Sequence, residues 1–235
     1  VVVQLRNGST GAQRVYYSTA IATWTEITDT DFTGLVHRGK MEHLDGYALI
    51  ADNTAKAIYS SDLNSLTAWG ADSYIPKNIK QDDVQGLAKL NKQIICFGSE
   101  TAELFYNAGN DVASPLGRLP DLFAAIGIPS QIVAGYTHYY ATLGNRIFFI
   151  GRKGPALGLS VYAYDGAKFE KVSSDAVDKI LTENAGANYS VNKITFRGQD
   201  AVAVQLTATT AATQRSLLFF PEWKDWLEWV STIFT

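Results

Sequence analysis

The stretch Gly39–Trp69, GKMEHLDGYALIADNTAKAIYSSDLNSLTAW, determines the fold that the sequence predicts. An extended run ends at Asp45-Gly46, a strand follows from Tyr47 to Ala51, and a second strand from Lys56 to Ser60 leads to a final run. An Asp-Gly pair between two extended runs indicates a hairpin, because both central residues of a type I′ turn need positive φ. The stretch therefore predicts a four-stranded antiparallel meander.

Hairpin turns of this kind recur along the chain. Asp45-Gly46, Asn91-Lys92, Gly144-Asn145 and Gly198-Gln199 each separate two extended runs, and the first positions 45, 91, 144 and 198 differ by 46, 53 and 54. Periods of about 40 to 50 residues with four strands each are typical of a β-propeller. The sequence predicts an all-β protein, a β-propeller of about five four-stranded blades that forms a single domain over residues 1–235.

Later strands of each blade can be aligned in the same way. Third strands are expected at 57–59, 103–106, 160–164 and 216–220, and fourth strands at 66–69, 168–172 and 226–229. The N-terminal segment fits only a second strand at 1–5, a third at 14–18 and a fourth at 23–27. Either residues 230–235 supply the missing first strand and close the ring, which would protect an apolar edge, or the chain is a fragment of a longer protein that begins inside a blade.

Two inserts interrupt the strand pattern. Residues 119–127 predict a short helix that ends near Gly127 and Pro129. Residues 173–184 predict a better helix, with Ser174 or Asp175 as N-cap and an apolar face of Val177, Ile180 and Leu181. We expect that face to pack on the flank of the propeller, with partner binding as the alternative.

Composition narrows the classes of function. Net charge is −3 and no run of Lys or Arg exceeds two residues, so the basic patch of a direct nucleic-acid binder is missing. No stretch reaches the roughly 18 apolar residues of a membrane span. Cys96 is the single cysteine and lies in an apolar run, which predicts a buried structural thiol.

Sequence motifs for catalysis are lacking. The phosphate loop, dinucleotide turn, zinc-protease helix and hydrolase elbow do not occur, so we expect no enzyme, no catalytic residue and no cofactor. His37 and His43 lie six apart on an extended run, where both could face one side, and His138 is the third histidine. A three-histidine metal site would need convergence across blades, which nothing in the sequence requires, and no metal is expected.

Carboxylates and tryptophans offer a second hypothesis. Acidic residues in or near loops are Asp82, Asp83, Glu100, Glu103, Asp111 and Asp121, and Trp223, Trp226 and Trp229 lie together near the C-terminus. We expect solvated loop charges and tryptophans that pack the last blade. A carbohydrate-cleaving or carbohydrate-binding propeller would instead use two of the acids and stack sugars on the rings.

Four segments, in order along the chain, resemble one known family. They are Tyr59–Leu63 with Leu66–Trp69, Val84–Asn91, Phe97–Gly109 and Lys171–Asp178. Together they resemble the packaged-DNA stabilisation proteins of short-tailed phages, the tail hub or head-completion component. The most distinctive parts are SSDL-x-x-LTAW and FG-x-x-TAELFYN-x-G.

This resemblance implies a non-enzymatic structural protein of the virion tail, made in the host cytoplasm. The protein would form a homo-oligomeric ring between the phage portal or adaptor proteins and the tail needle. Packaged DNA would be a neighbour without sequence-specific binding, and no membrane span or cofactor is implied. Loops 62–66 and 109–117 are the expected contact points for partners. A periplasmic or cell-surface scaffold is a further alternative, for which no export signal is visible.

Overall fold

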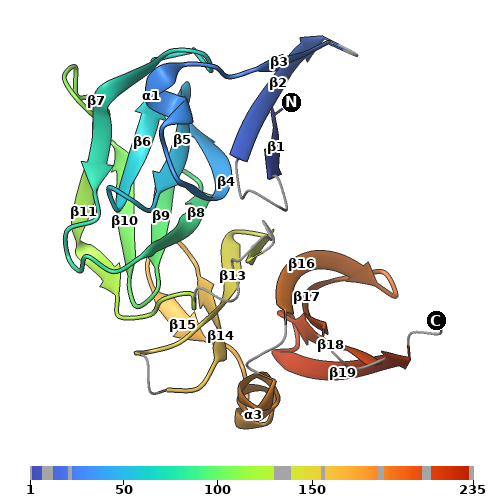
Figure 1. The fold of residues 1–235 in the computed structure, drawn as a ribbon. Coiled ribbons are helices and arrows are strands. Elements are labelled where there is room, and N and C mark those ends of the chain that lie inside the picture. The colour runs from blue at the N-terminus through green and yellow to red at the C-terminus, as the bar shows by residue number, and fades with distance from the viewer. Residues whose placement is uncertain are drawn as a thin grey trace. The chain divides into compact units, whose positions relative to one another are not determined.

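The protein, seen in a computed structural model, is all-β (Figure 1). The structure describes residues 2–6, 13–20, 23–129, 139–154, 157–184, 188–207 and 213–232. These residues form five sheets, in each of which strands adjacent in sequence pair. The chain divides into two compact units, Val1–Gly98 with Glu103–Asp121, and Ser99–Ala102 with Leu122–Thr235.

The first unit contains three sheets. The first sheet has the order β1 (Val2–Arg6), β2 (Gln13–Ala20), β3 (Thr23–Glu26). The second has β4 (His37–Leu44), β5 (Tyr47–Asp52), β6 (Ala57–Ser61), β7 (Trp69–Pro76). The third has β8 (Val84–Leu90), β9 (Gln93–Gly98), β10 (Ala102–Asn107), β11 (Leu116–Ala124). A short helix, α1 (Thr30–Thr33), precedes β4 and was not expected from the sequence.

The second unit contains two sheets and a helix. Its first sheet has the order β12 (Tyr140–Leu143), β13 (Arg146–Gly151), β14 (Ser160–Tyr164), β15 (Phe169–Lys171). The other has β16 (Asn188–Phe196), β17 (Gln199–Thr207), β18 (Thr213–Phe220), β19 (Asp225–Thr232). Between the sheets along the chain lies α3 (Asp175–Glu183). The rings of Phe148 and Phe219 lie 5.8 Å apart and join the two sheets.

The hairpin turns confirm the repeat on which the prediction rested. At Asp45-Gly46 both residues have positive φ, 47° and 93°, and Leu44 pairs with Tyr47 across the turn. The turns at 91–92 and 144–145 also lie where the sequence placed them. The fourth turn is Arg197-Gly198, one residue earlier than expected, with φ of 50° and 80°.

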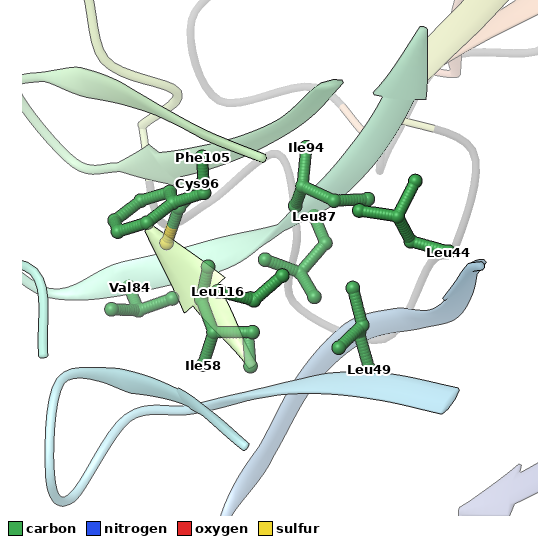
Figure 2. Close-up of a cluster of buried hydrophobic side chains, with 10 residues drawn as sticks. Leu44, Leu49, Ile58, Val84, Leu87, Ile94, Cys96, Phe105 and Leu116 are labelled. Atoms are coloured by element: carbon green, nitrogen blue, oxygen red, sulfur yellow. The ribbon is translucent and has the colours of Figure 1, made fainter. Parts of the chain in front are cut away.

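A buried apolar cluster joins the second and third sheets of the first unit (Figure 2). Its members, none more than 2% exposed, are Leu44, Leu49, Ala51, Ile58, Val84, Leu87, Ile94, Cys96, Phe105 and Leu116. Apolar surface removed from water contributes about 25 cal/mol per Å². This cluster therefore supplies much of the stability of the unit. A second cluster, which contains Val15, Phe32 and Trp69, joins the first sheet to the second.

Two expected elements are wrong. Residues 66–68 are not part of a strand, because residues 62–68 form a loop in which Asp62 N donates to Ala68 O at 2.8 Å, so the fourth strand begins only at Trp69. Residues 119–127 do not form a helix, because residues up to Ala124 belong to β11 at the edge of its sheet. An edge strand tolerates Pro120, which has no N–H to donate.

Helix α3 is confirmed close to its expected bounds. Ser174 is the N-cap and accepts a hydrogen bond from Val177 N. Val177 and Leu181 are buried, and the Tyr189 hydroxyl donates to Leu181 O at 2.8 Å. The apolar face therefore packs within its own unit, as expected.

Both chain ends bear on the question of ring closure. The three N-terminal strands lie where the sequence placed them and, among the described residues, form a three-stranded sheet. Residues 230–232 continue β19, where Val230 pairs with Arg215, so they complete their own sheet. Residues 233–235 lie outside the described part. The single propeller domain and its closure stay predictions.

We expect Leu87→Ala to lower the free energy of unfolding by about 2–5 kcal/mol, because it leaves a cavity in the buried cluster. Leu63→Ala is the matched control, since Leu63 is 57% exposed in the same unit, and should cost less than about 0.5 kcal/mol. Urea denaturation followed by tryptophan fluorescence measures both. Equal losses for the two variants would contradict the assignment of this cluster as the core.

Candidate functional site

The most distinctive side-chain constellation is a buried ionic network in the first unit. Lys77 and Glu103 have no exposed side-chain surface, the Asp82 side chain is 3% exposed and Arg118 is 23% exposed. Lys77 Nζ forms an ion pair with Asp82 Oδ1 and lies 3.6 Å from Glu103 Oε1. Arg118 Nε lies 3.1 Å from Glu103 Oε2. Two cations thus face two carboxylates, so the network is neutral overall.

Glu103 also organises the loop that connects β7 to β8. The backbone N–H of Ile79 donates to Glu103 Oε1 at 3.0 Å, and that of Asn78 donates to Oε2 at 3.3 Å. Lys77 Nζ donates to Lys80 O at 3.0 Å. Burying a charge is costly unless it is paired and hydrogen-bonded, and these contacts meet that condition. The network holds a long loop against β10, and both of its carboxylates are engaged in doing so.

Two glycines near this network occupy positions where a side chain would not fit. A Cβ added at Gly98 would lie 2.3 Å from Asp82 Oδ2, inside the ionic network. A Cβ added at Gly127 would lie 2.1 Å from Glu100 N. Thr101, Ala102, Glu103, Leu104 and Phe105 are all buried. The segment Phe97–Gly109 therefore contributes packing and hydrogen bonds to the fold. Its signal in the sequence was the acidic residue Glu103 among apolar residues.

The histidines do not gather. His37 is 3% exposed, whereas His43 is exposed. Their partners on β5 are Asp52 and Ala48, which lie four residues apart and therefore on one face of that strand, so the two histidines share a face of the sheet, as the sequence allowed. His138 lies outside the described residues.

His37 is held inside the cluster that joins the first two sheets. Its Nε2 lies 3.2 Å from Phe32 O, and its ring centroid lies 4.5 Å from that of Phe32. A carbonyl only accepts, so Nε2 carries the hydrogen, and Nδ1 has no hydrogen-bond partner in the described structure. Burial lowers the pKa of His37, a shift only partly opposed by the bond to Phe32 and the charge of Asp52.

The remaining carboxylates and the thiol have different surroundings. Asp83 and Asp111 are exposed, Glu100 is half-buried, and the Asp121 side chain lies outside the described part. Cys96 is fully buried, as expected, and burial raises the pKa of its thiol to about 12. A thiol with that pKa stays protonated at neutral pH and is inert. Among the described residues no three His, Cys, Asp or Glu side chains are placed to hold a metal ion.

The three C-terminal tryptophans have different surroundings. Trp226 packs at 4.9 Å against Phe219 and donates from Nε1 to Val172 O at 3.0 Å, which confirms a packing role. Trp223 and Trp229 are 60% and 52% exposed. The ring centroid of Trp223 lies 5.3 Å from that of Phe220, and the ring centroid of Trp229 lies 5.6 Å from that of Phe196. These two rings form an aromatic surface on the other face of the sheet.

Comparison with known proteins gives one informative match. A family model described as bacteriophage P22 Gp10, beta-propeller, matches residues 7–217. No curated protein matches the chain. The described part of the chain has no helix long and apolar enough to cross a membrane.

Likeness to solved structures is remote. A protein of Bacteroides fragilis NCTC 9343 described as exported shares 10% identity over 83% of this chain and 71% of that chain, with a TM-score of 0.29. PorZ, a surface component of the type IX secretion system of Porphyromonas gingivalis, shares 10% identity over 92% of this chain and 39% of that chain, also with a TM-score of 0.29. Neither likeness bears on the function of this chain.

Glu103→Gln tests the ionic network. The change removes one buried negative charge and leaves Lys77 and Arg118 undercompensated, so the free energy of unfolding should fall by about 3–5 kcal/mol. Asp200→Asn is the control, because the Lys193–Asp200 pair is half-exposed and should change stability little. Chemical denaturation at neutral pH measures both. A loss for Glu103→Gln no larger than that of the control would show that Glu103 is not needed to balance the buried cations.

His37 should make stability depend on pH. Its pKa is lower in the folded chain than in the unfolded chain, so acid favours unfolding and stability should fall as pH drops below about 6.5. The slope from this residue is at most about 1.4 kcal/mol per pH unit. His37→Gln, which keeps a donor for Phe32 O, should remove the slope, whereas His43→Gln should keep it. Denaturation at pH 5, 6 and 7 measures the slope, and an unchanged slope in His37→Gln would contradict the assignment.

Proposed function

The chain belongs to the bacteriophage P22 Gp10 β-propeller family, phage proteins that stabilise packaged DNA, and we propose that it is the tail hub or head-completion component of its virion. In this role it joins the portal or adaptor proteins to the tail needle as a homo-oligomeric ring, and it is made in the host cytoplasm. The family match over residues 7–217 carries the proposal.

The proposed fold in this role is one propeller domain over residues 1–235, with the five sheets as its blades. Support comes from the shared design of the sheets, each a run of strands adjacent in sequence. The first sheet, with three described strands, is the incomplete or end-closed blade.

DNA retention in this proposal is mechanical and is not an enzymatic activity. A protein that blocks the exit channel must resist pressure without gripping the phosphates that later pass it. The net charge of −3 suits such a wall, because it gives DNA no reason to adhere. The buried ionic network and the apolar cluster supply the rigidity. Glu103 and Asp82 face cations at close range, which leaves them poorly suited to act as an acid/base pair.

Phage particles assembled without this protein test the proposal. Their heads should package DNA and then lose it, so the DNase-protected DNA per head should fall at least about tenfold, and the purified chain should restore it. Electron microscopy should show the added chain as a ring at the exit vertex. Heads that keep their DNA without the protein would contradict the proposal.

Carbohydrate binding is the second candidate, and the exposed rings of Trp223 and Trp229 are the observation that favours it. The same particles discriminate between the two functions. If Trp223→Ala abolished binding on a glycan array and DNA retention did not depend on the protein, the carbohydrate function would be favoured.

A further inference from the structure

Two loops meet at one hairpin turn of the first unit. The turn is Asp45-Gly46, and the loops are residues 62–66 after β6 and residues 107–114, which begin with the last residue of β10. Asn64 N donates to Gly46 O at 2.8 Å, and Asn107 Nδ2 donates to Asp45 Oδ2 at 3.2 Å. The distinctive segment SSDL-x-x-LTAW supplies the shorter loop, and FG-x-x-TAELFYN-x-G supplies residues 107–109 of the longer one. The loop cluster consists of residues 45–46, 62–66 and 107–114.

Hydrogen bonds hold the longer loop in one conformation. Ala108 N donates to Pro115 O at 2.9 Å, and Asn110 Nδ2 donates to Ser114 O at 3.1 Å. Gly109 N donates to Asn107 Oδ1 at 3.0 Å. A preordered loop loses less conformational entropy when a partner binds.

The shorter loop is fixed as well. Ser65 N donates to Asp62 O at 3.1 Å. A Cβ added at Gly46 would lie 2.8 Å from both Asn64 Oδ1 and Leu63 Cδ1, so the loop packs closely on the turn.

The outward chemistry of the loop cluster is apolar and acidic. Leu63 is 57% exposed and Val112 is 83% exposed, although both loops are ordered. Asp45, Asp62 and Asp111 are exposed, and the cluster contains no Lys or Arg. A single exposed apolar residue is ordinary on any surface. Two of them on hydrogen-bonded loops that contact the same turn, among residues that include three exposed carboxylates and no Lys or Arg, form a surface of defined character.

We propose that the loop cluster is a docking surface for a protein segment that carries apolar side chains flanked by Lys or Arg. This inference rests on the proposed function, because it places the partner among the neighbouring proteins of the virion. Complementary charge steers such a segment to the surface, and the apolar contacts of Leu63 and Val112 hold it there. DNA is disfavoured as the occupant because three carboxylates repel phosphates.

The experiment uses DNA-filled heads of the same phage assembled without this protein as the probe. Leu63→Asp with Val112→Asp should weaken binding of the chain to these heads at least tenfold. Val36→Asp is the matched control, since Val36 is 49% exposed but lies just before the start of β4, whereas the Asp45-Gly46 turn follows the end of that strand. Sedimentation of labelled chain with heads measures the affinity.

A charge-reversal variant tests the expected positive charge of the partner, independently of the apolar variants. Asp62→Lys with Asp111→Lys should also weaken binding at least tenfold at low salt, and the difference from the unchanged chain should shrink as salt rises. Thermal unfolding confirms that each variant is folded. Tighter binding of the lysine variant would overturn the assignment of a basic partner.

Failure of the two proposals can be told apart. An unchanged chain that does not bind the heads would contradict the proposed function. If the unchanged chain binds and the loop-cluster variants bind as Val36→Asp does, the docking surface is overturned and the proposed function stands.

Discussion

Burial of Glu103 is the constraint on which the first unit depends. A carboxylate without solvent contact must be neutralised, and here Lys77 and Arg118 do so while backbone N–H groups of the β7–β8 loop donate to it. The cost of burying charge makes the arrangement interdependent, because losing one partner leaves the others uncompensated. The network therefore gives the unit geometric definition beyond what its apolar cluster provides.

Much of the fold could be predicted from hairpin turns because turn chemistry is local. Asp45-Gly46 needs positive φ whatever surrounds it, and that requirement appears directly in the residue types. The fourth strands were harder. Residues 62–68 form a loop closed by its own hydrogen bonds, and the apolar residues that lead to Trp69 do not distinguish such a loop from a strand. The β11 strand was mistaken for a helix because its pairing with β10, the preceding strand, is not visible in its own residue pattern.

The candidate site was less visible than the fold. Glu103 was seen as a loop charge because a sequence does not show which cations will converge on it. The contact of Lys77 with Glu103 spans two sheets, and that of Asp82 depends on the missing side chain of Gly98. The different burial of His37 and His43, which share a face of the sheet, was not visible in their spacing. The buried face of α3 was predictable because the helical spacing of its apolar residues is a local feature of the sequence.

The pairing of strands adjacent in sequence also affects how the chain folds during synthesis. Each sheet pairs neighbours in sequence, so each can form soon after its residues leave the ribosome. Lys77 is different, because its partner Glu103 lies 26 residues later in the chain and is missing until it is made. The loop after β7 therefore acquires its native structure late, and the nascent chain passes through a stage in which a future buried cation is still solvated.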